Sequence, residues 1–152
     1  MKRFVWRLQK VLEINQKRQQ AKKAELMKII QKLDLARANL LAQQRILQDL
    51  IESVARQSLA QRLDRQQLLL KSTKKNDELI KKQKDQVRRL ELDRKQATAE
   101  FLKIKRFTEG LENLREQDKR RFIAEQERLE QKEMDEHTSM RFADKLIHAS
   151  QS

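Results

Sequence analysis

The chain has 152 residues, with 36 Lys+Arg against 23 Asp+Glu for a net charge of +13, one Gly, no Pro and no Cys. Gly and Pro build most tight turns, so their near absence excludes sandwiches, barrels and doubly wound sheets, which need many such turns. Aromatic residues make up only 4% of the chain, too few for a compact core. The composition therefore predicts an all-α protein made of one or two long helices.

The chain is expected to lie in the cytoplasm. It has no Cys, which excludes disulfides and fits a reducing compartment. No run approaches the ~20 apolar residues of a membrane-spanning helix. The charged opening resembles the start of a signal peptide, but Arg7, Lys10 and Glu13 interrupt any apolar stretch after it. We therefore expect no signal peptide.

The first residues carry two large aromatic side chains. Phe4, Trp6 and Leu8 are two residues apart, a spacing that does not match one face of a helix. If the helix begins at residue 3, Trp6 points away from the apolar face. Trp6 then anchors a partner, or Phe4 and Trp6 cover the open end of the fold by packing on C-terminal residues such as Met140 or Phe142, and the two roles can coexist.

A seven-residue repeat runs through the first half of the chain. Two rows of residues form an a/d seam of the kind that a left-handed coiled coil requires. They are Val5, Leu12, Gln19, Leu26, Leu33, Leu40, Leu47 and Val54, and Leu8, Asn15, Lys22, Ile29, Ala36, Gln43 and Leu50. The polar members cost stability but can fix the register of the pairing.

The weakest helical stretch is STKKND at residues 72–77. Ser, Thr, Asn and Asp compete for backbone hydrogen bonds and favour turns and helix caps. We therefore predict a turn at about residues 71–77. An alternative break lies at residues 56–58, where the first seam ends, and would make 58–70 a separate short helix.

The second half repeats the seam less regularly. Its apolar members are Val87, Leu90, Ala97, Phe101, Ile104, Leu111, Phe122 and Leu129, interrupted by Arg94, Thr108, Arg115, Asp118 and Glu125. Two seams joined by a turn predict an all-α fold, a long antiparallel two-helix coiled-coil hairpin. It would be a single domain over 1–152, with helix 1 at about 3–70, helix 2 at about 78–146, a frayed tail to 152, and the chain ends meeting. The alternative is one unbroken rod that dimerises in parallel.

Nothing in the sequence predicts an enzyme. There is no Cys, no Gly-rich phosphate loop and almost no loop to hold a catalytic group, so we expect no catalytic residue and no cofactor. Glu133 and His137 could share one side of a helix, but two ligands do not make a metal site. Gly110 either permits a bend near Phe107 or is tolerated on a surface. The positive charge favours anionic partners, yet no element that reads nucleic acid is present, so nucleic acid is not the expected partner.

Both ends of the chain resemble one family. The opening MKRFVWRLQKVLE at residues 1–13 resembles the start of the flagellar export protein FliJ family. The segment ERLEQKEMDE at residues 127–136 resembles its C-terminal signature, in which Gln-Lys and Asp-Glu frame a hydrophobic residue. Injectisome stalk proteins of the YscO type are similar in build, and the residues leave both branches open.

This resemblance implies a non-enzymatic component of the type III export apparatus. Proteins of the family form an antiparallel coiled coil similar to the γ stalk of rotary ATPases and dock in the hexameric export ATPase FliI, whose regulator is FliH. They also contact the export gate protein FlhA and help to recycle export chaperones. The expected location is the cytoplasm, peripherally at the cytoplasmic face of the inner membrane.

The matching motifs lie at the two ends that a hairpin would bring together. We therefore predict that a partner-binding site lies near the ring-inserted end, formed by Phe4, Trp6, Arg7, Gln131, Lys132 and Asp135. The alternative function is that of a basic coiled-coil protein that binds nucleic acid or an anionic surface.

Overall fold

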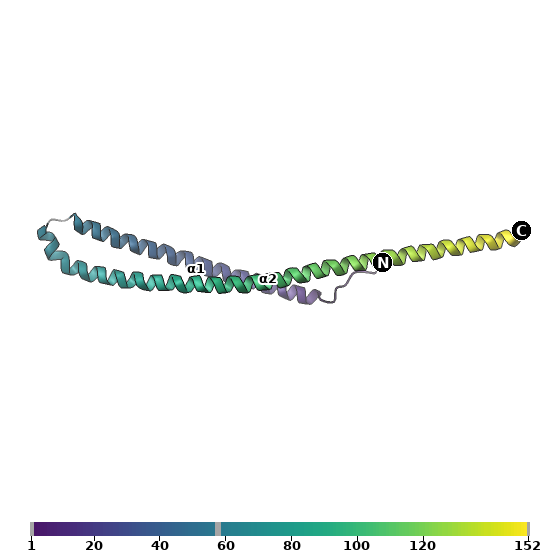
Figure 1. Cartoon of the computed structure of the whole chain (residues 1–152), viewed down its shortest axis with the longest axis horizontal. Coiled ribbons are helices and arrows are strands. Elements are labelled where there is room, and N and C mark those ends of the chain that lie inside the picture. Colours follow the sequence, from purple (N-terminus) through teal and green to yellow (C-terminus); the bar gives the residue numbers. More distant parts are fainter. Residues whose placement is uncertain (1, 57–58, 152) are drawn as a thin grey trace. The chain divides into compact units, whose positions relative to one another are not determined.

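The structure is a computed structural model that describes residues 2–56 and 59–151. These residues contain two helices, α1 (Gln9–Ala55) and α2 (Leu59–Gln151) (Figure 1). The predicted all-α hairpin fold is confirmed. Two compact units share the two helices. Unit 1 comprises residues 1–17 and 105–152, and unit 2 comprises residues 18–104. The single domain over 1–152 stays a prediction.

In unit 2 the two helices lie side by side and run in opposite directions (Figure 1). Lys22 Nζ contacts Glu100 Oε2 at 3.1 Å, and Arg37 Nη2 contacts Glu91 Oε1 at 3.1 Å. As the residue number rises along α1, the number of its partner on α2 falls, which is the mark of antiparallel pairing.

The core of unit 2 lies on the predicted seam. Leu33 is fully buried and packs with Ala36 and Val87, with Leu40 and Leu90 at the edge of the cluster. A buried Leu surrounded by aliphatic neighbours is what an a/d seam provides, because each such side chain fills a hole on the facing helix.

The seven-residue repeat is confirmed along both helices. Every predicted seam residue from Leu8 to Val54 is buried or partly buried. Val5 is 83% exposed, because it precedes α1. On α2 the predicted apolar members are buried or partly buried from Val87 to Phe122, while Leu129 is exposed. A Cβ on Gly110 would meet open space, so this glycine is tolerated on a surface.

The predicted turn at residues 71–77 is wrong, because these residues lie within α2. Thr73, Asn76 and Ile80 continue the seam of α2 at intervals of three and four residues. Thr73 and Asn76 are both partly buried. Gln43 on α1 donates its Nε2–H to Asn76 Oδ1 over 3.0 Å. A polar pair across the seam therefore replaces the cap that these residue types suggested.

Helix α1 ends instead near the alternative break at residues 56–58. The backbone N–H of Arg56 still donates to the carbonyl of Glu52 over 3.2 Å. Gln57 and Ser58 lie outside the described residues, and α2 is helical from Leu59. Predicting helix 1 to residue 70 and helix 2 from residue 78 was therefore wrong.

In unit 1 the two helices differ greatly in length. The described part of α2 runs to Gln151, so the frayed tail predicted after residue 146 is helical as far as that residue. Beyond Phe122, whose ring meets Phe4, the helix continues for about 44 Å at 1.5 Å per residue. No second helix among the described residues of this unit lies beside it (Figure 1). The predicted meeting of the two chain ends is wrong, because the first helix is much the shorter.

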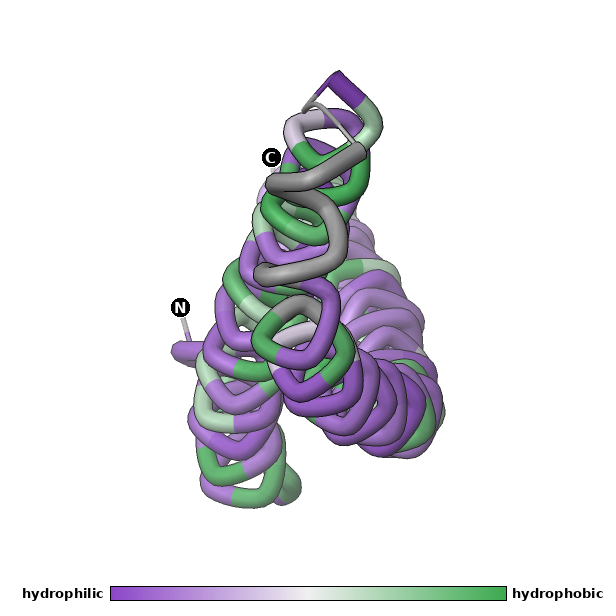
Figure 2. The backbone as a smooth tube through the Cα atoms, turned by 90° about the vertical axis from the view of Figure 1, so that its left-hand side faces the viewer, coloured by the Kyte–Doolittle hydropathy of each residue, from purple (hydrophilic) through white to green (hydrophobic). Residues whose placement is uncertain are grey.

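The surface of both helices is mostly polar. Figure 2 shows hydrophobic residues recurring as separate bands between longer hydrophilic stretches. Among the described residues, no helix has an apolar stretch long enough to cross a bilayer.

Candidate docking surface

The first residues form an extended segment, the N-terminal strap (residues 2–6), which lies on α2. Trp6 is only 7% exposed and packs with Leu12 and Leu111, and Phe4 and Leu8 pack against this cluster. Extended backbone places every second side chain on the same side. The two-residue spacing of the apolar side chains therefore fits a strap.

A hydrogen bond and a set of aromatic contacts fix the strap at two points. The indole Nε1–H of Trp6 donates to Asp118 Oδ2 over 2.9 Å. The ring of Phe4 lies 5.4 Å from that of Phe122, and the guanidinium of Arg115 lies 5.9 Å from the Phe4 ring centre. A cation over a ring face and a tilted pair of rings are both attractive arrangements.

The prediction that helix 1 begins at residue 3 is wrong, because α1 begins at Gln9. The strap instead contacts α2 through Trp6, which packs with Leu111 and bonds to Asp118, and through Phe4, which meets Phe122.

The aromatic residues of the strap pack on the second helix, as one of the two hypotheses predicted. The residues that they contact differ from the predicted ones. Trp6 packs on Leu111 and bonds to Asp118. Met140 and Phe142, the suggested partners, are 70% and 65% exposed.

Two residues that hold the strap were seen in the sequence only as interruptions of the seam. Arg115 donates its Nε–H to Gln9 Oε1 over 2.9 Å and stands over Phe4, while Asp118 accepts from Trp6. Both are partly buried at seam positions. Their heptad position was the signal, because a charged residue on a seam needs a partner across it.

The other predicted site residues are exposed. Arg7 lies in the turn before α1, and Gln131, Lys132 and Asp135 lie on the part of α2 beyond the strap. Gln131 Nε2 donates to Asp135 Oδ1 over 3.2 Å. Gln131 is about 13 Å along the helix from Phe122 at 1.5 Å per residue. The role of these four residues in partner binding stays a prediction.

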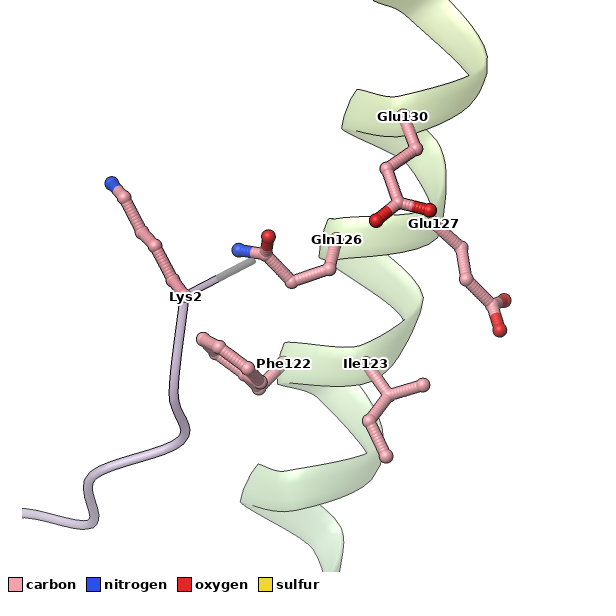
Figure 3. Close-up of a pocket in the computed structure, with 6 residues that line it drawn as sticks. All are labelled: Lys2, Phe122, Ile123, Gln126, Glu127 and Glu130. Carbon is pink, nitrogen blue, oxygen red and sulfur yellow. The ribbon is translucent and has the colours of Figure 1, made fainter.

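A groove opens where the strap begins. It has a volume of about 320 Å³ and is lined by Lys2, Phe122, Ile123, Gln126, Glu127 and Glu130. Figure 3 shows Phe122 and Gln126 pointing toward the segment that carries Lys2, and Glu127 pointing to the other side of the helix. The groove therefore joins an apolar floor to an acidic edge.

A second groove of about 560 Å³ follows along the same helix. It is lined by Glu130, Glu133, Met134, His137, Thr138 and Arg141. Glu133 and His137, the pair considered above as metal ligands, are both here. Within residues 2–56 and 59–151, no group of three or more His, Asp or Glu side chains is placed to hold a metal ion.

The helix around these grooves is acidic. Residues 125–136 contain six acids and two bases and have a net charge of −4. The net charge of the whole chain is +13. One of the acids is locally paired: Arg128 donates to Glu125 over 2.7 Å, and this hydrogen bond and the positive charge hold the pKa of the Glu125 carboxyl below its ordinary value. Lys2 lines the first groove and Arg141 lines the second, one at each end of this acidic surface.

Comparison with known proteins points to one family. The profile of the family described as "Flagellar FliJ protein" matches residues 3–146. Neither the curated proteins nor the solved structures give a significant match. The match spans the strap, both helices and the acidic segment, and it favours the flagellar branch over the injectisome branch. The chain belongs to the FliJ family of flagellar proteins.

Proposed function

We propose that this protein is a stalk of the flagellar type III export apparatus that docks in the ring of the export ATPase FliI. The FliJ family has a role in flagellar export and is a non-enzymatic component of it. The observation that carries the finer proposal is the match over residues 3–146, which includes residues 3–13 of the opening motif and all of residues 127–136.

The architecture of unit 1 supports docking by this end of the chain. A pair of helices is about 20 Å across, given a diameter of 10–12 Å for each helix with its side chains. The strap covers the α2 seam next to the start of α1, where Trp6 and Phe4 close the helix pair, and α2 continues beyond it as a single helix. A narrow helix pair that continues as one helix fits insertion into the pore of a ring.

The exposed charges would then make the contacts with the ring. Arg7, Gln131, Lys132 and Asp135 are exposed, and the three charged ones include both signs of charge. Charged groups at the edge of an interface raise the rate of association and fix its register, and their effect falls with salt. Phe4 and Trp6 would position this end from within, since they are packed on α2.

The remaining partners follow from the same proposal. The part of the chain that stays outside the ring would contact the export gate protein FlhA and receive export chaperones, and FliH would act through the ATPase. The protein would lie at the cytoplasmic face of the inner membrane through these contacts, without a span of its own among the described residues.

The proposal is tested with purified FliI from the same organism. We expect Lys132→Ala combined with Arg7→Ala to weaken binding about tenfold and to reduce stimulation of ATP hydrolysis, because two interfacial charges are lost. Lys82→Ala combined with Lys75→Ala is the matched control, because both are exposed lysines of unit 2. Equal binding by the test and control variants would refute docking by the unit 1 end.

A further inference from the structure

The two acidic grooves lie on one face of α2. Successive residues of a helix are about 100° apart. On that spacing the residues that line the two grooves fall within an arc of about 160°. Glu130 lines both grooves, so the two form one continuous surface, the acidic stripe, between residues 122 and 141.

Two exposed apolar side chains lie on the acidic stripe, three helical turns apart. Ile123 is 46% exposed and Met134 is 66% exposed. They are eleven residues apart, which places them about 20° from each other around the helix and about 16 Å apart along it. Anchors on one face at this spacing are what an amphipathic helix uses when it packs against another helix.

The charge between the anchors is negative. Glu127, Glu130 and Glu133 line the acidic stripe between Ile123 and Met134. Without residues 125–136, the chain has a net charge of +17. The acidic stripe thus places an acidic segment beside exposed apolar side chains in a strongly basic chain.

We propose that the acidic stripe is the docking site for a cationic amphipathic helix of a partner protein. Its apolar face would cover Ile123, Phe122 and Met134, and its Lys or Arg side chains would pair with the three glutamates. The proposal goes beyond docking to the ATPase ring and does not depend on it. Gln131, Lys132 and Asp135 do not line the acidic stripe. Lys132 and Asp135 lie about 180° and 120° around the helix from Ile123.

Charge complementarity selects this occupant. An acidic partner would meet three like charges, and a bare apolar helix would leave the glutamates without partners while removing them from water. Self-pairing of two stripes is disfavoured for the same reason, since each copy would present the same three glutamates.

The test measures the binding of a labelled peptide to the full chain by fluorescence anisotropy. The probe is an 18-residue helical peptide of Leu and Lys with all Leu on one face. One control peptide has the same composition in scrambled order. The other control peptide keeps the order and has Glu in place of every Lys. We expect the amphipathic Leu/Lys peptide to bind and both control peptides to bind at least about tenfold more weakly, because they lack the apolar face or the charge.

Variants of the chain locate the bound peptide. We expect Glu127→Lys with Glu130→Lys to weaken binding about tenfold, and Ile123→Ser with Met134→Ser to weaken it by a similar factor. Glu136→Lys with Glu125→Lys is the matched control, because it makes the same charge change in the same segment on the opposite face. Circular dichroism of each variant checks that the helices are intact.

Three results would overturn the proposal. The first is equal weakening by the stripe pair and the Glu125/Glu136 pair, which would mean attraction to net charge alone. The second is equal binding of the scrambled peptide. The third is a concentration-dependent dimer of the unmodified chain in sedimentation velocity that Glu130→Lys abolishes, which would make a second copy the occupant. None of these results bears on FliI binding through Lys132, so the two proposals fail separately.

Discussion

Trp6 and Asp118 are 112 positions apart in the sequence, yet the indole N–H of Trp6 donates to the carboxylate of Asp118 over 2.9 Å. This bond ties the strap to α2 at the point where α1 no longer covers it. Trp6 is the only tryptophan of the chain. Its fluorescence therefore reports on the strap alone.

We expect Asp118→Ala to loosen the strap. The substitution leaves the indole N–H of Trp6 without its acceptor, and a lost hydrogen bond to a charged group costs about 1.5–3 kcal/mol. The measurements are the emission maximum and acrylamide quenching of Trp6, which should shift to the red and become more efficient. Asp144→Ala, on the exposed end of α2, is the control and should change neither. Unchanged emission in Asp118→Ala would show that the strap does not depend on this bond.

The seam predicts a sharp contrast between two neighbouring leucines. Leu33 is fully buried, whereas Leu35 is 64% exposed. We expect Leu33→Ala to lower the free energy of unfolding by about 2–5 kcal/mol through lost burial and the cavity that it leaves. Leu35→Ala should change it by less than about 0.5 kcal/mol. Urea denaturation followed by circular dichroism at 222 nm measures both, and similar losses for the two would place the seam elsewhere.

The Gln43–Asn76 pair predicts non-additive substitutions. Either Gln43→Leu or Asn76→Leu alone leaves one amide at the seam without its partner, so each should destabilise by about 1–3 kcal/mol. The double variant removes both amides and places two Leu side chains across the seam, so it should be neutral or more stable than the parent. A double-mutant cycle from urea denaturation tests this. Additive losses would mean that the two side chains do not meet.

The Lys22–Glu100 contact predicts a loss of stability at alkaline pH. The hydrogen bond to Glu100, helped by Glu25, raises the pKa of Lys22 above its ordinary value. A raised pKa in the folded state adds stability that is complete below the unfolded pKa of about 10.4 and disappears as the pH rises through the folded value. We expect the difference in Tm between the parent and Lys22→Met to shrink between pH 9 and pH 11.5. A difference that stays constant over this range would show that the ammonium group is not responsible.

The sequence predicted the seam well and the turn badly, for one physical reason. Heptad spacing reports which residues face a partner helix, and it held from Leu8 to Val54 and from Val87 to Phe122. Residue type reports local preference, and at residues 72–77 that preference is overridden by pairing across the seam, as the Gln43–Asn76 bond shows. Extending the α2 heptad backward through Ile80, Asn76 and Thr73 would have revealed this.

The site was only partly predictable for a related reason. The two-residue spacing of Phe4 and Trp6 was visible, but its use depends on a contact with Asp118 far along the chain. The acidic stripe was not predicted, because its grooves depend on α2 continuing as a helix without a partner beyond Phe122. Local composition at residues 125–136 carried the acidic signal, but not the fact that this face stays open.

The most direct test of the proposed function is hydrogen–deuterium exchange of the full chain, alone and with excess FliI. Residues 127–150 of α2 should exchange quickly in the free chain, because all of them are exposed. We predict that FliI slows exchange in the strap and in residues 111–136 and leaves residues 66–100 unchanged, and that Lys132→Ala reduces this protection. Protection confined to residues 66–100, or no protection at all, would contradict docking by the end of the chain that carries the strap.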